Sequence, residues 1–342
     1  MARRARRRRD RPPPAAASTA SSDGGGAGEG PIRVGVSSCL VGMSVRYDGG
    51  HKRNAFVADL LGRFVELVAV CPEVEMGLGT PRPAIRLERR GAAVRLVDPR
   101  NGLDHTDRME RFARRRLEEI GRLELCGYIL KRDSPSCGME RVRLYGDGPP
   151  SRDGVGAFAR ALRERFPLLP VEEEGRLADS GLRENFVERV YAYRRLRDLL
   201  ARGPGVGDLV RFHTTEKLLL LSHDPDGYRR LGRLVARAKG APRAELRRDY
   251  GELFMKALAQ KATLGRQTNV LLHMAGYLKV ILSPMEKVEL AEAIADFRAG
   301  ILPLVVPLTL LRHHVRKHAI RYLEGQSYLS PHPKELMLRN HA

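Results

Sequence analysis

Cysteine and long apolar runs are both scarce in this sequence. Four cysteines in 342 residues do not make a disulfide framework, and in a reducing compartment they are more often core thiols, metal ligands or catalytic groups. The longest apolar run, Ile301 to Leu311, contains Pro303 and Pro307 and is far shorter than the roughly 20 residues that cross a bilayer. The sequence therefore predicts a soluble protein that does not contact a membrane.

Negative charge is also in short supply, because 41 acidic residues face 61 lysines and arginines, for a net charge of +20. Part of the excess lies in the first eleven residues, where seven arginines accompany Asp10. Pro, Ala, Ser and Gly follow instead of an apolar signal core, so this start is no export signal, and we expect a cytoplasmic protein. Residues 1–30 lack apolar periodicity and are predicted to be disordered.

Strand and helix patterns alternate between residues 31 and 200. Such alternation favours an α/β domain with an open, mostly parallel sheet. The predicted strands are Ile32 to Val36, Val65 to Val70, Val94 to Val97 and Cys126 to Leu130, and the predicted helices are Ala55 to Phe64, Thr106 to Leu123, Gly154 to Phe166 and Leu182 to Ala201.

A linker with strong helix-breaking character, Gly203-Pro204-Gly205 within residues 201–207, ends this domain. From residue 208 to 342, helical patterns follow one another without strand signals, so the second domain is predicted to be all-α. The predicted helices are Asp208 to Ser222, Pro225 to Ala238, Arg243 to Lys261, Thr268 to Leu282, Pro284 to Ala299 and Pro303 to Glu324.

Three of the cysteines follow predicted strands. Cys39 comes after the first strand, Cys71 ends the second, and Cys137 lies in the loop after the strand that Cys126 begins. Because ligand sites of open α/β sheets lie beyond the carboxyl ends of the strands, we expect these three thiols to converge, with Cys126 at the opposite edge. Residue type alone leaves buried core thiols, a zinc site and an iron-sulfur cluster open.

The neighbours of these cysteines form three ordered blocks. They are Cys39-Leu40-Val41-Gly42 with Val45-Arg46-Tyr47-Asp48-Gly49 and Lys52, Cys71-Pro72-Glu73-Val74 with Gly79-Thr80-Pro81-Arg82-Pro83, and Leu130-Lys131 with Ser134-Pro135-Ser136-Cys137-Gly138. The region from about Ile32 to about Arg194 thereby resembles the thiouracil desulfidase family, also called domain of unknown function 523. The resemblance implies a [4Fe-4S] cluster held by Cys39, Cys71 and Cys137, with Cys126 as a core thiol.

The same resemblance implies non-redox desulfuration of a thiolated nucleobase or related thioamide, with release of sulfide. The thiocarbonyl sulfur would bind the iron that lacks a protein ligand, while water attacks the adjacent carbon. We expect Glu73 to accept the proton of that water. Ser134 and Ser136 are assigned to position the substrate or relay a proton, and Lys131 to stabilise charge that develops on oxygen.

Asp48 and Arg82 are assigned to bind the substrate, and Arg82 is a second candidate donor to a developing oxyanion. Five of the six assigned residues also have a structural interpretation, in which Ser134 caps its loop. Asp48 is a turn residue before Gly49 in that interpretation, Glu73 caps the turn after Pro72, and the two basic residues pair with surface carboxylates.

The helical half resembles a second family, the YbgA-like domain of unknown function 1722, through Phe212-His213 with Lys217 to Leu220, Asn269 to Leu271, and Tyr328 to Asn340. Fusion of the two families is a known arrangement, but the second brings no activity. We expect this domain to cover or recruit the substrate. No carboxylate pattern supports His313, His314 and His318 as metal ligands.

Two rival functions stay open. In the first, the cluster or a zinc ion is structural, and the basic tail and helical domain bind nucleic acid, a role that would suit the face shared by His213 and Lys217. In the second, oxidation of the cluster regulates binding to a partner. The sequence identifies neither the thiolated substrate nor the oligomeric state.

Overall fold

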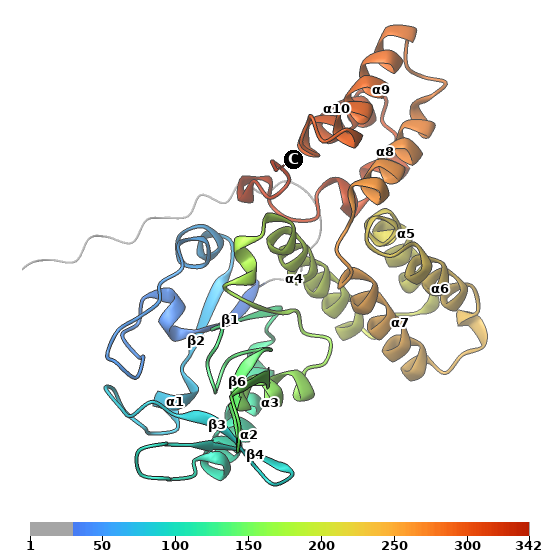
Figure 1. The fold of residues 1–342 in the computed structure, drawn as a ribbon. Coiled ribbons are helices and arrows are strands. Elements are labelled where there is room, and N and C mark those ends of the chain that lie inside the picture. The colour runs from blue at the N-terminus through green and yellow to red at the C-terminus, as the bar shows by residue number, and fades with distance from the viewer. Residues whose placement is uncertain (1–29, 342) are drawn as a thin grey trace, which may run out of the picture.

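An α/β region and a helical region follow each other in the computed structural model, which describes residues 30–341. Helix α4 (Ser180–Ala201) lies between the two regions (Figure 1). The predicted disorder of residues 1–30 falls outside the described residues, Gly30 excepted. Within residues 30–341, no helix combines the length and the apolar character that a membrane span needs. The predicted order of fold classes is confirmed.

Four parallel strands form the central sheet, in the order β2-β1-β5-β8. The strand β5 is buried along its whole length, as in parallel sheets that are covered on both faces. The strands are β1 (Arg33–Ser37), β2 (Glu66–Val70), β5 (Gly127–Leu130) and β8 (Val171–Glu173). The sequence predicts the first three and misses β8, because three residues are too few for a recognisable alternation.

Alternate side chains of the sheet enter two different cores. Tyr128 of β5 packs with helices α2 (Thr106–Leu123) and α3 (Ala157–Arg165), whereas its neighbour Ile129 packs with α4. A Cβ on Gly35 would lie 2.2 Å from the Tyr128 ring, so glycine is required in β1 where that ring covers the strand. Helices on both faces hold the carboxyl ends of the strands, and the loops that follow them, in fixed positions.

A second, mixed sheet with the order β4-β3-β6-β7 was not predicted. The sequence analysis expected one sheet and placed Val94 to Val97 in it, but that strand belongs to the second sheet. Its partner β3 reads Arg-Leu-Glu-Arg-Arg, which gives no apolar alternation. The predicted helix from Gly154 begins only at Ala157, because Gly154 pairs with Val142. The strands are β3 (Arg86–Arg90), β4 (Ala93–Val97), β6 (Val142–Tyr145) and β7 (Ser151–Gly154).

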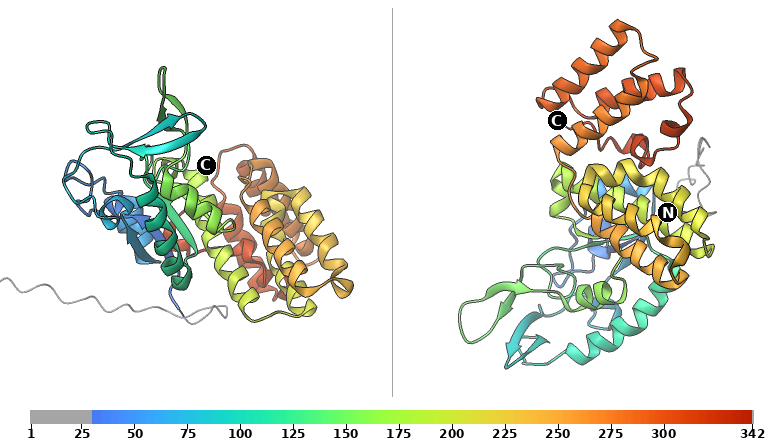
Figure 2. Two further views of the ribbon diagram at one scale, coloured as in Figure 1. Left: turned by 90° about the horizontal axis from the view of Figure 1, so that it is seen from below. Right: turned by 90° about the vertical axis from the view of Figure 1, so that its right-hand side faces the viewer.

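The helical region shares one apolar core with the end of α4, whose Leu196 is fully buried there. Helices α5 and α7 pack against α4, and α8 to α10 extend away from the α/β region (Figure 2). The helices are α5 (Val206–His223), α6 (Pro225–Ala236), α7 (Arg243–Leu258), α8 (Leu264–Leu278), α9 (Pro284–Arg298), α10 (Val305–Lys317) and the short α11 (Arg321–Glu324).

The last predicted helix, Pro303 to Glu324, is wrong in its length. It breaks after Lys317, where Ala319 adopts a left-handed φ of 50° and ends the helical hydrogen-bond pattern. The segment that follows, residues 325–341, returns to the α/β region. Its Leu336 and Leu338 are buried in the same core as Cys39. The C-terminal segment therefore joins the helical region to the loop that carries the first cysteine.

Candidate functional site

Three cysteines line one cavity of about 400 Å³ at the carboxyl edge of the central sheet. Cys39 lies in the turn Ser38–Val41 directly after β1, and Cys71 precedes the short helix α1 (Pro72–Glu75) directly after β2. Cys137 lies in the loop after β5 and is 7% exposed. The structure thus brings together the three thiols that the sequence analysis assigned to a cluster.

Cys126 lies elsewhere, at the start of β5, and is fully buried. Its Sγ is 3.9 Å from the backbone oxygen of Glu124, and its backbone N–H donates to Arg33 in β1. It does not line the cavity. Its surroundings are those of a core thiol.

Burial dominates the electrostatics of the cavity thiols. It raises the pKa of Cys39 to about 11, although the positive charge of Lys131 opposes the shift. It raises the pKa of the Cys137 thiol still further above its ordinary value, while a hydrogen bond with Ser37 opposes it. Thiolates at these positions therefore need a compensating cation.

The three thiols do not form a compact single-ion group in this structure. Four thiolates around one zinc ion lie roughly 3.8 Å apart, because Zn–S bonds are about 2.3 Å long. Among the described residues, the cysteines do not belong to any group of three ligands whose donor atoms all lie within 4.8 Å of one another. Three thiols that open into one cavity at wider spacing fit ligands on three different irons.

Glu73 is fixed from both sides of its carboxylate. Its Oε2 accepts hydrogen bonds from Nε and Nη2 of Arg82, at 2.9 and 2.7 Å, and its Oε1 accepts one from the hydroxyl of Ser136, at 2.8 Å. The Arg82 side chain is only 4% exposed. Its Nη1 donates to the backbone oxygens of Val45 and Gly79, so its donors are engaged within the protein. Glu73 and Arg82 line the cavity, whereas Ser136 lies fully buried behind them.

Ser134 shapes the loop of the third cysteine. Its Oγ accepts hydrogen bonds from the backbone N–H groups of Ser136 and Cys137, at 3.2 and 3.1 Å. Gly138 completes this tight loop, since a Cβ there would lie 2.3 Å from Val142 Cγ2. Ser134 therefore holds a cysteine in place and also faces the cavity.

Lys131 is held by a residue that the sequence analysis missed. Its Nζ donates to Glu174 and to the backbone oxygen of Arg132, while the other oxygen of Glu174 accepts from the backbone N–H of Arg132 at 2.7 Å. Glu174 directly follows β8 and so marks the same sheet edge as the cysteines. If β8 had been predicted as a strand, the position of Glu174 directly after it would have placed Glu174 at the same sheet edge as the cysteines.

Asp48 stands apart from the other assigned residues. Its carboxylate accepts from the backbone N–H of Gly50 at 3.0 Å and pairs with Arg46, and it does not line the cavity. Arg46, Tyr47 and Lys52 line it instead.

The helical region contributes no lining residue to this cavity within the described part of the chain, since all of them lie between residues 37 and 137. The expectation that the second domain covers or recruits the substrate therefore stays a prediction. Its C-terminal segment instead supports the core beneath Cys39, through Leu336 and Leu338.

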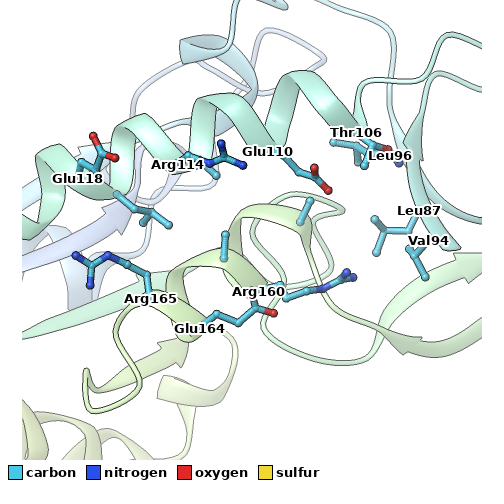
Figure 3. Close-up of a pocket in the computed structure, with 14 residues that line it drawn as sticks. Leu87, Val94, Leu96, Thr106, Glu110, Arg114, Glu118, Arg160, Glu164 and Arg165 are labelled. Atoms are coloured by element: carbon cyan, nitrogen blue, oxygen red, sulfur yellow. Dashed lines mark hydrogen bonds between the residues drawn. The ribbon is translucent and has the colours of Figure 1, made fainter.

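A second hollow of about 520 Å³ lies between α2 and α3, above Leu87 and Leu96 of the mixed sheet (Figure 3). Glu110 and Arg114 of α2 and Arg160 of α3 surround it (Figure 3). It contains no cysteine and none of the assigned residues. The site chemistry is concentrated in the smaller cavity.

Comparisons with known proteins match both regions. Residues 34–174 match the 2-thiouracil desulfurase family, and residues 217–333 match DUF1722, a family of proteins of unknown function. The uncharacterized protein YbgA of Escherichia coli strain K12 is 30% identical over 153 residues, which cover 44% of this chain and 90% of YbgA. The uncharacterized protein YbbK of Bacillus subtilis strain 168 is 33% identical over 108 residues, which cover 30% of this chain and 71% of YbbK.

Among solved structures, the [4Fe-4S]-dependent thiouracil desulfidase TudS is similar. It is 34% identical, with a TM-score of 0.37, over 43% of this chain and 94% of the TudS chain.

Proposed function

The first region of this chain belongs to the 2-thiouracil desulfurase family and the second to the DUF1722 family, and from this premise we propose that the chain is an iron-sulfur enzyme. It removes sulfur from a thiolated nucleobase or related thioamide and releases sulfide. The observation that carries the proposal is the convergence of Cys39, Cys71 and Cys137 on one cavity that Glu73 and Lys131 also line. The volume of the cavity, about 400 Å³, is within the range of small-molecule sites.

In this proposal Cys39, Cys71 and Cys137 hold a [4Fe-4S] cluster. When bound, such a cluster supplies a Lewis-acidic iron, free of a cysteine ligand, for the substrate sulfur. The presence of three cysteines, and no fourth, in the cavity lining supports this donor set. Free thiols in the chain fit a reducing compartment, so we place the enzyme in the cytoplasm.

The carboxylate of Glu73 acts on the attacking water. Arg82 and Ser136 fix its orientation, and Oε1, which receives only the hydrogen bond from Ser136, keeps acceptor capacity for one more donor, whereas Oε2 already accepts two from Arg82. It can therefore accept a proton from a water molecule in the cavity as the water oxygen bonds to the thiocarbonyl carbon. Because all three guanidinium nitrogens of Arg82 already have partners within the protein, its role is to position Glu73.

Of the two basic residues assigned from the sequence, Lys131 is the one that keeps a donor for the substrate. Its Nζ has three donors, of which Glu174 and the backbone oxygen of Arg132 accept two, and the third can face a ring oxygen or nitrogen of the base. The reaction balances without electrons: water supplies the new carbonyl oxygen, and its two protons leave with the sulfur as hydrogen sulfide.

The first experiment measures iron, acid-labile sulfide and zinc in protein purified without oxygen, together with sulfide release from 2-thiouracil. We expect about four irons and four sulfides per chain. Replacement of Cys39, Cys71 or Cys137 by Ala should abolish both the cluster and the activity, whereas Cys126→Ala, the matched control, should retain both. Stoichiometric zinc in place of iron, or full activity in any of the three variants, would refute the proposal.

The second experiment separates cluster binding from proton transfer. Glu73→Gln keeps the hydrogen bond from Ser136 and should leave the iron content unchanged, while sulfide release falls by roughly 10² to 10⁴. Asp153→Asn, at an exposed carboxylate outside the cavity, serves as the control and should retain activity. Unchanged turnover in Glu73→Gln at full iron content would remove Glu73 from the mechanism.

A further inference from the structure

Two histidines at the C-terminal end of α10, His314 within the helix and His318 at its C-cap, lie near a glutamate of α9, far along the chain from the cysteine cavity. The two helices pack side by side (Figure 1). His314 and His318 are one turn apart at the C-terminal end of α10, and therefore lie on the same face of that helix. Glu286 lies in the first turn of α9 and points to the same place.

The donor atoms of these three side chains converge. They all lie within 4.8 Å of one another, and Nδ1 of His314 is 4.0 Å from Oε1 of Glu286. In a tetrahedral zinc site, donor atoms lie roughly 3.3 Å apart, because Zn–N and Zn–O bonds are about 2.0 to 2.1 Å long. Small rotations of the three side chains would bring the donor atoms from their present spacing to that of a zinc site.

The histidine nitrogens have no other partner in the part of the chain that the structure describes. His314 is only 4% exposed, and its buried Nδ1 lacks a hydrogen-bond partner. The Nε2 of His318 is also buried without one. Buried polar atoms in native proteins are nearly always satisfied, and each exception needs an explanation such as an ion. His314 Nδ1 faces the Glu286 carboxylate, and His318 offers a donor atom within 4.8 Å of both, so one bound ion would explain the unsatisfied nitrogens.

Glu286 is already oriented for such a role. Its Oε2 accepts the backbone N–H of Ser283 at 2.8 Å in the N-terminal cap of α9, which leaves Oε1 directed toward His314. The Nζ of Lys317 lies 2.7 Å from that Oε1, and the Lys317 side chain is 48% exposed. Lys317 therefore competes for the carboxylate in the absence of metal and can turn into solvent when metal binds.

Another group with similar composition shows what a filled site looks like. Glu184, Glu188 and His332 also place their donor atoms within 4.8 Å of one another. There the guanidinium of Arg339, which is 6% exposed, already pairs with both carboxylates. Nε2 of His332 is also buried there without a hydrogen-bond partner, but Arg339 already supplies the positive charge that the two carboxylates need. Beside Glu286, the competing cation is the half-exposed Lys317, which can leave the carboxylate.

We propose that Glu286, His314 and His318 bind a divalent first-row transition metal, with Zn²⁺ as the occupant. Two imidazoles and one carboxylate are a donor set that Zn²⁺ favours, and three protein ligands leave a fourth position for water. The ion joins the first turn of α9 to the last turn of α10. The sequence analysis dismissed these histidines because their carboxylate lies on the preceding helix.

The test titrates Zn²⁺ into chelator-washed full-length protein by calorimetry and compares matched variants. Any zinc that binds at the cysteines is the same in the wild type and in every variant, so it does not affect the difference between them. We expect the wild type to bind one equivalent more than His318→Gln, and Glu286→Gln to lower affinity at that site by roughly 100-fold or more. His313→Gln, on the exposed neighbour of His314, should match the wild type. Lys317→Met should bind more tightly, because it removes the competitor for Glu286.

A second readout uses Co²⁺ in place of Zn²⁺. The extra equivalent should produce ligand-field bands without thiolate-to-cobalt charge transfer, which distinguishes it from metal bound at the cysteines. Equal stoichiometry in the wild type, His318→Gln and Glu286→Gln would overturn the proposal, as would loss of binding in His313→Gln. Circular dichroism checks that each variant is folded, and either ligand variant alone suffices for the comparison.

Discussion

Replacement of Arg339 by Met should destabilise the protein by removing the centre of a buried ionic network. The guanidinium lies between two carboxylates of α4, at 3.1 Å from Glu184 and 2.6 Å from Glu188, and donates to the backbone oxygen of Tyr328 at 2.7 Å. Burial and the neighbouring Glu188 raise the pKa of Glu184, while Arg339 lowers it. Without Arg339, two carboxylates stay buried, and Glu188 retains only His223 as a partner, at 3.0 Å.

Loss of one member of a buried ion pair costs about 3 to 5 kcal/mol, since the remaining charge is left without compensation. For a domain of 150 to 250 residues, about 4 kcal/mol corresponds to a fall of roughly 10 °C in melting temperature. Thermal and urea unfolding, each followed by circular dichroism and by tyrosine fluorescence, would measure the change and show whether the two regions unfold together.

The control is Lys334→Met, an exposed position in the same C-terminal segment, which should change the free energy of unfolding by no more than about 0.5 kcal/mol. Addition of Glu184→Gln to Arg339→Met should restore part of the loss, because it removes one uncompensated charge. A cost below about 1 kcal/mol for Arg339→Met, or an equal cost for Lys334→Met, would refute the account of the network.

Two further predictions concern the pH and the backbone. Burial and Lys217 lower the pKa of His213 to about 4, below the value near 6.5 of the unfolded chain. As the pH drops from about 6.5 to 4, the free energy of unfolding should therefore fall by up to about 3 kcal/mol through this group. His213→Gln should flatten this part of the plot of stability against pH. The control His273→Gln, at an exposed position, should leave the plot unchanged. Gly35→Ala should destabilise the protein by about 1 to 3 kcal/mol or more, because the new Cβ would collide with the buried Tyr128 ring. Gly276→Ala, on α8 with nothing near its Cβ position, should stabilise the protein by about 0.5 to 1 kcal/mol. Urea titration measures both changes, and equal effects would contradict the packing argument.

The sequence allowed the strands β1, β2 and β5 to be predicted because each is a short apolar run that ends at a turn signal. The positions of Cys39, Cys71 and Cys137 followed from those strands, since the carboxyl ends of parallel strands meet at one edge. The mixed sheet could not be predicted in the same way. Its strand Arg86–Arg90 has one buried apolar side chain, and pairing, not periodicity, makes it a strand.

Contacts between distant residues were the harder part of the site. Glu73, Ser134 and Lys131 were assigned from their place beside cysteines, but nothing local shows that Arg82 would engage its donors on Glu73 and Val45. Long-range partners depend on the tertiary fold, whereas propensity and turn chemistry are local properties of the sequence.

The two regions share structural elements on both sides of the linker. Helix α4 contributes Phe186 to the core that contains Cys39 and Leu196 to the core of the helical region. The C-terminal segment crosses in the other direction and buries Leu338 beneath the first cysteine loop. Since interiors are close-packed, a shift of the helical region changes the packing under that loop without any contact with the substrate. The proposed zinc ion, which joins α9 to α10, stiffens the part of the helical region from which that segment starts.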